Sequence, residues 1–155
     1  MRELILLRHA HAESPAPGQD DRARELSPTG LAEARAAGDW LREHGLQPDR
    51  VLCSPAQRTR QTLDAAGIAG DVRVEDAIYD ASPGTLIALA DTHGDARRLL
   101  LVGHNPGLEQ LAALLHSGQT SDYRGMPPGG IAVLEFAADA AIEPGAARLS
   151  HFWWP

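Results

Sequence analysis

The sequence predicts an α/β protein in which a central, mostly parallel sheet is covered by helices on both faces, giving three layers, α/β/α. Short apolar runs alternate along the chain with longer segments of helical periodicity. Two of the runs are apolar throughout, as expected for strands that are buried on both faces. A chain of 155 residues is long enough to bury one core, so we expect a single domain over residues 1–155.

The short apolar runs are the expected strands. They lie at residues 4–7, 51–53, 72–74, 99–102 and 131–136, with a last candidate around 149–153, and the run at 72–74 is the weakest of them. The loop between the last two contains Glu143-Pro144-Gly145, which predicts a terminal hairpin. The irregular segment 119–130 is long for a connection, which makes it a candidate loop facing the substrate.

The ends of four helices can be read from the sequence. Four expected starts combine a side-chain acceptor with proline: Ser27-Pro28, Ser54-Pro55, Ser82-Pro83 and Asn105-Pro106. The acceptor satisfies a free amide and proline has no amide to leave unpaired, and Gln57 gives Ser54 the spacing of a capping box. Glycine follows each expected end, at His44-Gly45, Ala66-Gly67, His93-Gly94 and His116-Ser117-Gly118. The predicted helices therefore span 28–44, 55–66, 83–93 and 106–116.

Composition and charge argue against several classes of protein. The net charge of −7 argues against a nucleic-acid partner. No apolar run approaches the roughly 18 residues of a membrane span, and the run at 4–7 is shorter than the about 7–15 residues of a signal-peptide core. The single cysteine, Cys53, cannot form an intrachain disulfide and is expected to be a small buried hydrophobe. We therefore expect a cytoplasmic protein with no membrane partner.

Four of the seven histidines are expected to have structural roles. His44, His93 and His116 fall in predicted last turns of helices, where an imidazole can meet free carbonyls and the negative end of the helix dipole. His151 lies in the terminal strand beside aromatic residues, and we expect it to pack or to sit at the sheet edge.

His9 and His104 differ, because each lies just past the carboxyl end of an apolar run. In open α/β sheets, that edge is where ligands bind. If the two strands are adjacent and parallel, both imidazoles enter one crevice. The alternative for each is a histidine satisfied within the core.

Two arginines are expected at the same edge. Arg58 falls in the first turn of a predicted helix, where free amides already favour an anion, and Arg8 directly precedes His9. Two planar guanidinium groups can hold the non-bridging oxygens of a phosphoryl group in bidentate fashion, which lysine does less specifically. A surface salt bridge is the alternative, and it suits Arg60 better than Arg58.

These residues resemble the motifs of the histidine phosphatase superfamily, in their order and in their spacing. The matching segments are Leu7-Arg8-His9-Ala10, Ser54-Pro55-Ala56-Gln57-Arg58-Thr59-Arg60-Gln61-Thr62 and Val102-Gly103-His104-Asn105-Pro106. An early segment, Arg24-Glu25-Leu26-Ser27-Pro28-Thr29-Gly30, is similar to the short bacterial branch of SixA-like phosphohistidine phosphatases. The resemblance covers about residues 3–115 and implies a phosphoglycerate mutase-like fold.

The resemblance implies that His9 is the nucleophile, transiently phosphorylated, and that Arg8, Arg58 and His104 form the phosphate pocket. Neutral imidazole is a competent nucleophile near pH 7, and a two-step transfer lets water attack a phosphohistidine later. Fixed donors around the phosphoryl oxygens need little reorganisation as charge redistributes. No cofactor and no metal is implied.

A leaving alkoxide also needs a proton, and in the larger superfamily a carboxylate after the third strand region supplies it. Asp80 matches that position best, while Glu75 and Asp76 are alternatives, as is a solvated acid in a turn with no part in catalysis. The basic nitrogen of a phosphoramidate reduces the demand for an acid, so an imperfect donor would suit phosphohistidine better than a phosphate ester.

The sequence departs from the phosphoglycerate mutases in its length. Only residues 75–98 separate the third and fourth expected strands, which leaves no room for the helical insertion that lids their pocket. An open pocket favours a phosphate displayed on a protein, or promiscuous small phosphorylated metabolites, over a mutase that must keep its intermediate from water. We expect a phosphohistidine phosphatase, with a broad-specificity phosphomonoesterase as the alternative.

Two further alternatives come from other classes. A metallohydrolase could use His9, His11 and His104, since His9 and His11 alternate, but the sequence offers no obvious set of carboxylate ligands. A phosphate-binding module without turnover would keep the pocket and lose the chemistry. The terminal cluster Phe152-Trp153-Trp154 could cover the core or form a contact, and we expect core cover and a monomer.

Overall fold

The computed structural model describes residues 2–121 and 124–155 and confirms the predicted α/β class. Its strands form one six-stranded sheet in the order β3-β2-β4-β1-β5-β6. They are β1 (Arg2–Arg8), β2 (Arg50–Cys53), β3 (Asp71–Val74), β4 (Arg98–Gly103), β5 (Ile131–Phe136) and β6 (Arg148–Trp153). Strands β1 to β4 are parallel to one another, while β5 pairs antiparallel with both β1 and β6, so the terminal hairpin is confirmed.

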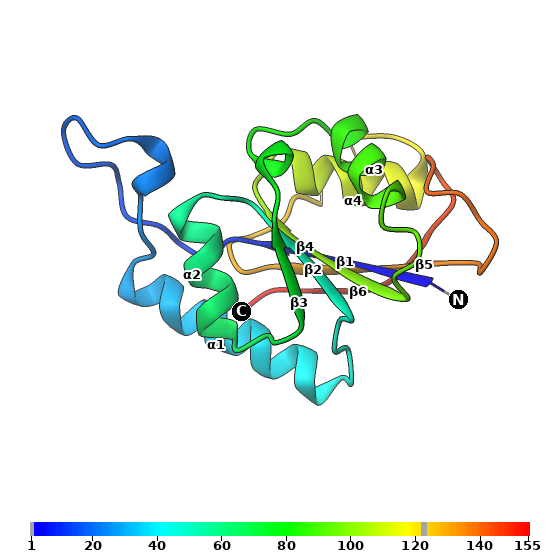
Figure 1. Ribbon diagram of the computed structural model, residues 1–155, viewed down its shortest axis with the longest axis horizontal. Helices are drawn as coiled ribbons and strands as arrows, with labels where there is room; N and C mark the ends of the chain where they lie inside the picture. The colour runs from blue at the N-terminus through cyan, green and yellow to red at the C-terminus, as the bar shows by residue number, and fades with distance from the viewer. Residues whose placement is uncertain (1, 122–123) are drawn as a thin grey trace.

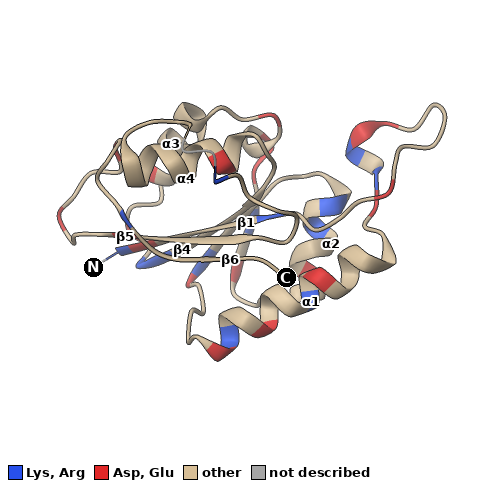
Figure 2. Cartoon of the chain, turned by 180° about the vertical axis from the view of Figure 1, so that it is seen from behind, with Lys and Arg blue, Asp and Glu red and all other residues tan. Residues whose placement is uncertain are grey.

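Helices cover both faces of this sheet, as Figure 1 shows. The helices are α1 (Pro28–Glu43), α2 (Gln57–Ala66), α3 (Pro83–Asp91) and α4 (Gly107–Ser117), with short 3₁₀ turns η1 (Asp21–Ala23) and η2 (Asp76–Ile78). Alternate residues of β1 enter opposite cores: Ile5 and Leu7 pack towards α1 and α2, and Leu4 and Leu6 towards α3 and α4. Acidic and basic positions are interspersed along α1 (Figure 2).

Two of the four predicted helix starts are confirmed. Ser27 caps α1 by accepting a hydrogen bond from the amide of Gly30, and Ser82 caps α3 by accepting one from Thr85. In both helices proline occupies the first turn, as the sequence predicts.

The predicted start at Ser54 is wrong. Helix α2 begins at Gln57, its cap position is Ala56, and no side chain caps it. The hydroxyl of Ser54 instead lies 2.7 Å from a ring nitrogen of His104, so the capping box with Gln57 does not form. The Ser54 hydroxyl therefore contacts His104, 50 residues away in the sequence, instead of capping the adjacent helix.

The start of α4 also differs from the prediction. Pro106 is the cap position rather than the first helical residue, and the helix begins at Gly107. Asn105 still contributes, because its side-chain oxygen accepts a hydrogen bond from the amide of Glu109 at 3.2 Å. The prediction therefore identified Asn105 correctly as an acceptor, but the helix begins one residue later than predicted, at Gly107.

The helix ends follow the predicted glycines with one exception. Gly67 and Gly118 take the left-handed conformation at the ends of α2 and α4. Gly94 does not, and α3 ends at Asp91, before the predicted end at 93. The hydroxyl of Thr92 bonds to the Leu89 carbonyl and closes that last turn early.

The structure also bears on the predictions for Cys53, for membrane spans, for the lid and for the loop at 119–130. Cys53 is buried, with 1% of its surface exposed, as a small hydrophobe should be. No helix in the described part of the chain is long and apolar enough to cross a membrane. Between β3 and β4 the chain forms only η2 and α3, so the helical lid is missing, as predicted. The long loop at 119–130 includes residues 122–123, which lie outside the described residues.

Candidate active site

Three parallel strands deliver the candidate site residues to one edge of the sheet. Arg8 is paired with Gly103 in the register of β1 and β4, so His9 and His104 follow at the same level. The amide of His9 bonds to the Gly103 carbonyl at 3.0 Å, and the two imidazole rings lie 5.3 Å apart between centroids. The predicted convergence of the two histidines is therefore present.

His9 is held as a neutral imidazole with one nitrogen free. Its Nδ1 lies 2.8 Å from the carbonyl oxygen of Ala10, and a carbonyl can only accept, so Nδ1 carries the proton. Burial lowers the pKa of His9 to about 3, outweighing the opposing effect of this hydrogen bond. The lone pair is consequently on Nε2, the atom available for attack on an electrophile.

His104 is held in the opposite tautomer. Its Nε2 lies 2.7 Å from Oγ of Ser54, and that oxygen also accepts a longer hydrogen bond from the amide of Ala56. Because the Ser54 hydroxyl has no other acceptor among the described residues, its proton is directed to Nε2, which places the imidazole proton on Nδ1. This Nδ1 is buried and has no partner among the described residues. Burial, with Arg58 nearby, lowers the pKa of His104 to about 4.

Arg8 is anchored by a main-chain carbonyl. Its Nη1 donates to the carbonyl oxygen of Met126 at 2.7 Å, while its Nε is buried without a partner among the residues described. Burial lowers the pKa of Arg8, with nearby carboxylates opposing the shift, but a guanidinium remains protonated at all ordinary pH values. The segment that carries Met126 thus reaches the site through its backbone.

Arg58 is anchored in the same manner on the other side of the site. The residue is 6% exposed, and its Nη1 donates to the Asp21 carbonyl oxygen at 2.7 Å. Its Nη2 lies 3.0 Å from the Asp21 carboxylate, which gives an ion pair. As in Arg8, the Nε is buried and lacks a partner within residues 2–121 and 124–155.

The arrangement offers three buried nitrogen donors without partners: Nε of Arg8, Nε of Arg58 and Nδ1 of His104. Buried donors are normally satisfied, so a group of them around one histidine calls for an acceptor-rich ligand. A phosphoryl group has the oxygens and the negative charge that two guanidiniums and an imidazole donor would complement. The geometry can therefore hold a phosphoryl group before Nε2 of His9.

The three candidate acids occupy different surroundings. Asp80 is exposed, has a left-handed backbone (φ 55°), and lines a pocket of about 250 Å³ together with His104. Glu75 precedes η2 and Asp76 lies within it, and neither lines this pocket. The structure thus brings Asp80 beside the site and leaves the two alternatives outside the pocket.

Three of the other histidines, His11, His44 and His93, have partners elsewhere. Nδ1 of His11 lies 2.7 Å from Oγ of Ser27, away from the ring pair of the site. His44 contacts the carbonyl of Trp40, the role expected at a helix end, and stacks on its ring. His93 lies beyond α3, which ends at Asp91, so it is not in a last turn as predicted. It is buried and lies 3.3 Å from an Arg50 nitrogen. Across residues 2–121 and 124–155, no three His, Cys, Asp or Glu side chains are grouped to hold a metal ion.

Sequence reasoning missed three parts of this site. Ser54 was assigned to a helix cap, and nothing local distinguishes a capping serine from one that contacts a distant histidine. Asp21 and Tyr79 were not singled out, although the ring of Tyr79 lies 5.5 Å from that of His104 and its hydroxyl donates to Asp21. A row of acidic and basic residues in a loop gives no signal of a contact with α2.

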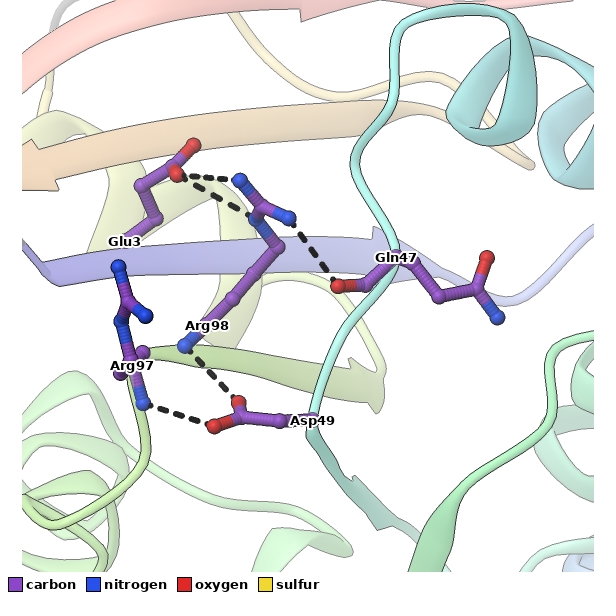
Figure 3. Close-up of a pocket in the computed structure, with 5 residues that line it drawn as sticks. All are labelled: Glu3, Gln47, Asp49, Arg97 and Arg98. Carbon is purple, nitrogen blue, oxygen red and sulfur yellow. Dashed lines mark hydrogen bonds and ion pairs between the residues drawn. The ribbon is translucent and has the colours of Figure 1, made fainter.

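A second pocket lies at the opposite, amino-terminal edge of the sheet (Figure 3). Its volume is about 280 Å³, but its side chains are largely engaged with one another. Arg98 pairs with Glu3 at 2.8 Å, and both carboxylate oxygens of Asp49 accept main-chain amides. Pocket size alone would favour this place, and buried Nε atoms without a hydrogen bond in the described chain also occur at this edge, on Arg2 and Arg50. The carboxyl edge differs because there such donors lie with two buried, neutral histidines.

Comparison with known proteins gives the family of the chain. Residues 4–86 match the histidine phosphatase superfamily (branch 1). An uncharacterized protein of Mycobacterium tuberculosis is 42% identical over 155 residues, which cover 94% of this chain and 98% of that protein. The phosphohistidine phosphatase SixA of Escherichia coli is 27% identical over 125 residues, 76% of each chain.

A solved structure of a SixA protein also has the same fold as this chain. The SixA protein of Nakamurella multipartitia, provisionally assigned as a phosphohistidine phosphatase, superimposes with a TM-score of 0.87 at 36% identity. The superposition covers 99% of this chain and 96% of that one. The chain therefore belongs to the histidine phosphatase superfamily (branch 1), as a phosphatase similar to its SixA members.

Proposed function

We propose that the protein hydrolyses phosphohistidine, or similarly exposed phosphoryl groups, through a covalent phosphohistidine formed on His9. One observation carries this proposal: the Nδ1 proton of His9 is bound by the Ala10 carbonyl, which leaves the Nε2 lone pair free beside a group of unpartnered donors. A neutral, oriented imidazole is what a nucleophile at phosphorus requires.

The proposed reaction has two steps, phosphoryl transfer to His9 and hydrolysis of the phosphohistidine. In the first, Nε2 of His9 forms a bond to phosphorus while the bond from phosphorus to the leaving nitrogen or oxygen breaks, and the leaving atom takes up a proton. In the second, water attacks phosphorus, the bond between phosphorus and Nε2 breaks, and one water proton is released to solvent or to a nearby base. Inorganic phosphate departs and His9 returns to its neutral state.

Arg8, Arg58 and His104 stabilise the transferring group. Their three unpartnered nitrogens supply hydrogen bonds, and the two guanidiniums supply positive charge, from side chains that are already held in place. Because Arg8 and Arg58 are each anchored through Nη1, the Nε edges need no reorganisation as charge shifts between the phosphoryl oxygens.

Asp80 is the proposed proton donor for ester leaving groups. It shares with His104 the pocket of about 250 Å³, where a leaving group beyond the phosphoryl would lie. An imidazole leaving group is basic and can take its proton from solvent, so Asp80 should matter least for phosphohistidine.

The open surroundings of the site support a phosphoryl group displayed on a protein. Residues 75–97, where a lid would be inserted, form only η2, α3 and short connections. A side chain that projects from a partner protein can therefore approach. We also propose that the protein acts as a cytoplasmic monomer, which size-exclusion chromatography with light scattering tests. Trp153 is partly buried and packs against the core beside α1, but the expected core cover does not extend to Trp154, which is 53% exposed.

A substrate panel tests the proposal. Wild type, His9→Ala and the matched control His116→Ala, at an exposed position, are compared on a phosphohistidine protein, a phosphoserine peptide and 4-nitrophenyl phosphate. We expect the highest kcat/KM on phosphohistidine and at least about a thousandfold loss in His9→Ala alone. Full activity in His9→Ala would overturn the proposal, and phosphate binding without turnover in wild type would favour a binding module.

Exhaustive chelation separates the proposal from a metallohydrolase that uses His9, His11 and His104. Since the proposed steps need no metal, activity should survive dialysis against a chelator. His11→Ala should also retain activity, because the ring of His11 is bonded to Ser27 instead. Loss of activity on chelation, restored by a divalent metal, would support the metallohydrolase.

A further inference from the structure

We infer that Asp21 is a positioning residue of the phosphate site, which holds the guanidinium of Arg58 by its Nη end so that the Nε edge faces the phosphoryl group. The inference rests on the proposed function, because it takes Arg58 as a phosphate ligand. It assigns a role to a loop residue that lies 37 positions from Arg58 in the sequence.

The segment 13–25, which carries Asp21, projects from the body of the protein (Figures 1 and 2). Its two ends are joined by an antiparallel bridge between Ala12 and Leu26 and by a hydrogen bond from the Glu13 amide to the Glu25 carbonyl. Near its end, Asp21 opens η1 and turns back onto the first turn of α2. An otherwise exposed segment therefore makes direct contact with a buried arginine.

The contact fixes the orientation of the Arg58 guanidinium, and Asp21 leaves unbound its Nε and one N–H on each terminal nitrogen. Asp21 binds both terminal nitrogens, with its main-chain carbonyl on Nη1 at 2.7 Å and its carboxylate on Nη2 at 3.0 Å. The remaining Nε is buried and has no partner in the described chain. A planar guanidinium gripped at two nitrogens cannot rotate, so the carboxylate fixes the direction of the third.

Tyr79 holds the carboxylate of Asp21 in turn. The Tyr79 hydroxyl donates to the same oxygen that receives Nη2 of Arg58. This hydrogen bond is the main reason that the pKa of Asp21 lies well below its usual range and that the pKa of Tyr79 is raised. The guanidinium of Arg22 lies 4.4 Å from the Tyr79 ring centroid, a cation–π contact that fixes the ring from the loop side.

Arg8 provides an internal comparison. Its Nη1 is bound by a main-chain carbonyl at the same distance, 2.7 Å, and no ion pair with its side chain is present among residues 2–121 and 124–155. Arg8 is carried by β1, in the centre of the sheet, whereas Arg58 extends from a helix surface. The additional carboxylate is thus found on the arginine whose own backbone is farther from the sheet.

A double-mutant cycle on Asp21 and Arg58 tests the inference. We measure kcat and KM on 4-nitrophenyl phosphate for wild type, Asp21→Ala, Arg58→Ala and the double variant. If Asp21 acts through Arg58, Asp21→Ala lowers kcat/KM about tenfold or more, and it has no further effect once Arg58 is absent. Equal losses in both backgrounds would overturn the inference, as would full activity in Asp21→Ala.

Two controls separate positioning from charge and from folding. Asp39→Ala removes an exposed acid that pairs with Arg42 at 2.8 Å, so it changes the net charge equally and should leave kcat/KM unchanged. Asp21→Asn keeps an oxygen acceptor for Nη2 and should recover most of the activity that Asp21→Ala loses. If Asp39→Ala matched Asp21→Ala, the effect would be one of overall charge and the inference would be wrong.

Binding of inorganic phosphate distinguishes a failure of this inference from a failure of the proposed function. Calorimetry is used to compare wild type with Asp21→Ala and Arg58→Ala. If wild type binds phosphate without turning over any substrate, the proposed function fails, and a weaker affinity in Asp21→Ala still supports the positioning role. Unchanged phosphate affinity in Asp21→Ala, beside a weakened Arg58→Ala, would contradict it.

Discussion

Ser54 and His104 are joined by a hydrogen bond of 2.7 Å between a hydroxyl that is fully buried and the Nε2 of the imidazole. The bond determines the tautomer of His104, because the Ser54 hydroxyl has no other acceptor among the described residues and therefore donates to Nε2. The Nδ1 proton is then directed away from Ser54 and is available to a phosphoryl oxygen. Ser54, which follows β2, therefore determines which ring nitrogen of His104, which follows β4, carries the proton.

Ser54→Ala should lower kcat on 4-nitrophenyl phosphate by up to about tenfold, the loss expected from one hydrogen bond of about 1.4 kcal/mol. Without the hydroxyl, the proton of His104 can move to Nε2 and the donor at Nδ1 is lost. Steady-state kinetics measure the effect. Ser150→Ala, which removes a hydroxyl bonded to the Val133 carbonyl in the terminal hairpin, is the control. Equal kcat in wild type and Ser54→Ala would contradict the assigned tautomer.

The pH dependence of stability follows from the lowered pKa values of His9 and His104, about 3 and about 4 against the ordinary 6.5. Between about pH 4 and pH 6.5 the unfolded chain binds more protons at these histidines than the folded chain does. The free energy of unfolding therefore rises with pH in this range, and this stability is lost as the pH falls from about 6.5 towards 4. Each histidine contributes up to about 1.4 kcal/mol per pH unit. Urea unfolding at pH 5 and pH 7 measures the slope.

His104→Asn separates these histidines from the carboxylates, which also titrate as the pH falls. The variant should show a smaller loss of stability between pH 7 and pH 5 than wild type does. His116→Asn, at an exposed position on α4, is the control. A slope as steep in His104→Asn as in wild type would show that His104 does not titrate in this window.

The acid side of the activity profile tests the same shift in the free enzyme. Because burial holds the pKa of His9 near 3, the nucleophile stays neutral well below pH 6.5. We therefore expect kcat/KM to show no loss of activity centred on pH 6.5 that can be assigned to His9. A stable aryl phosphate is the substrate for this profile, because phosphohistidine itself hydrolyses in acid. An ionisation at 6.5 that disappears in a His9 variant with residual activity would contradict the shift.

Asp80→Asn should distinguish substrates by their leaving groups. The variant cannot donate a proton, so hydrolysis of a phosphoserine peptide should fall about a hundredfold, the scale of general acid catalysis. Phosphohistidine and 4-nitrophenyl phosphate, whose leaving groups need less assistance, should be affected much less. Uniform loss on all three substrates would assign Asp80 to structure, and no loss on any would remove it from the reaction.

Much of the fold could be predicted from local patterns. The buried strands β1 and β4 were evident because apolar side chains fill both of their faces, and the caps at Ser27 and Ser82 act within their own helices. The carboxyl-edge location of His9 and His104 followed from parallel strands meeting at one edge. These features depend on neighbours in sequence or on sheet geometry alone.

The errors and omissions share a different cause. Ser54, Asp21 and Tyr79 take their partners from segments far along the chain, and the same residue types serve equally well as caps, solvated acids and core aromatics. At Ser54, a distant imidazole competed with the local helix cap and prevailed. The anchoring of Arg8 by the Met126 carbonyl involves a backbone atom, which no side-chain pattern encodes.

The most direct test of the account is the detection of the phosphorylated enzyme. Wild type and His9→Ala are mixed with a phosphohistidine protein, quenched rapidly in base, which preserves phosphohistidine, and analysed by intact mass and peptide mapping. We predict one added phosphoryl group on the peptide that contains His9, formed and lost at rates consistent with kcat, and no such group in His9→Ala. Turnover by wild type with no phosphorylated intermediate, or the same label in His9→Ala, would contradict it.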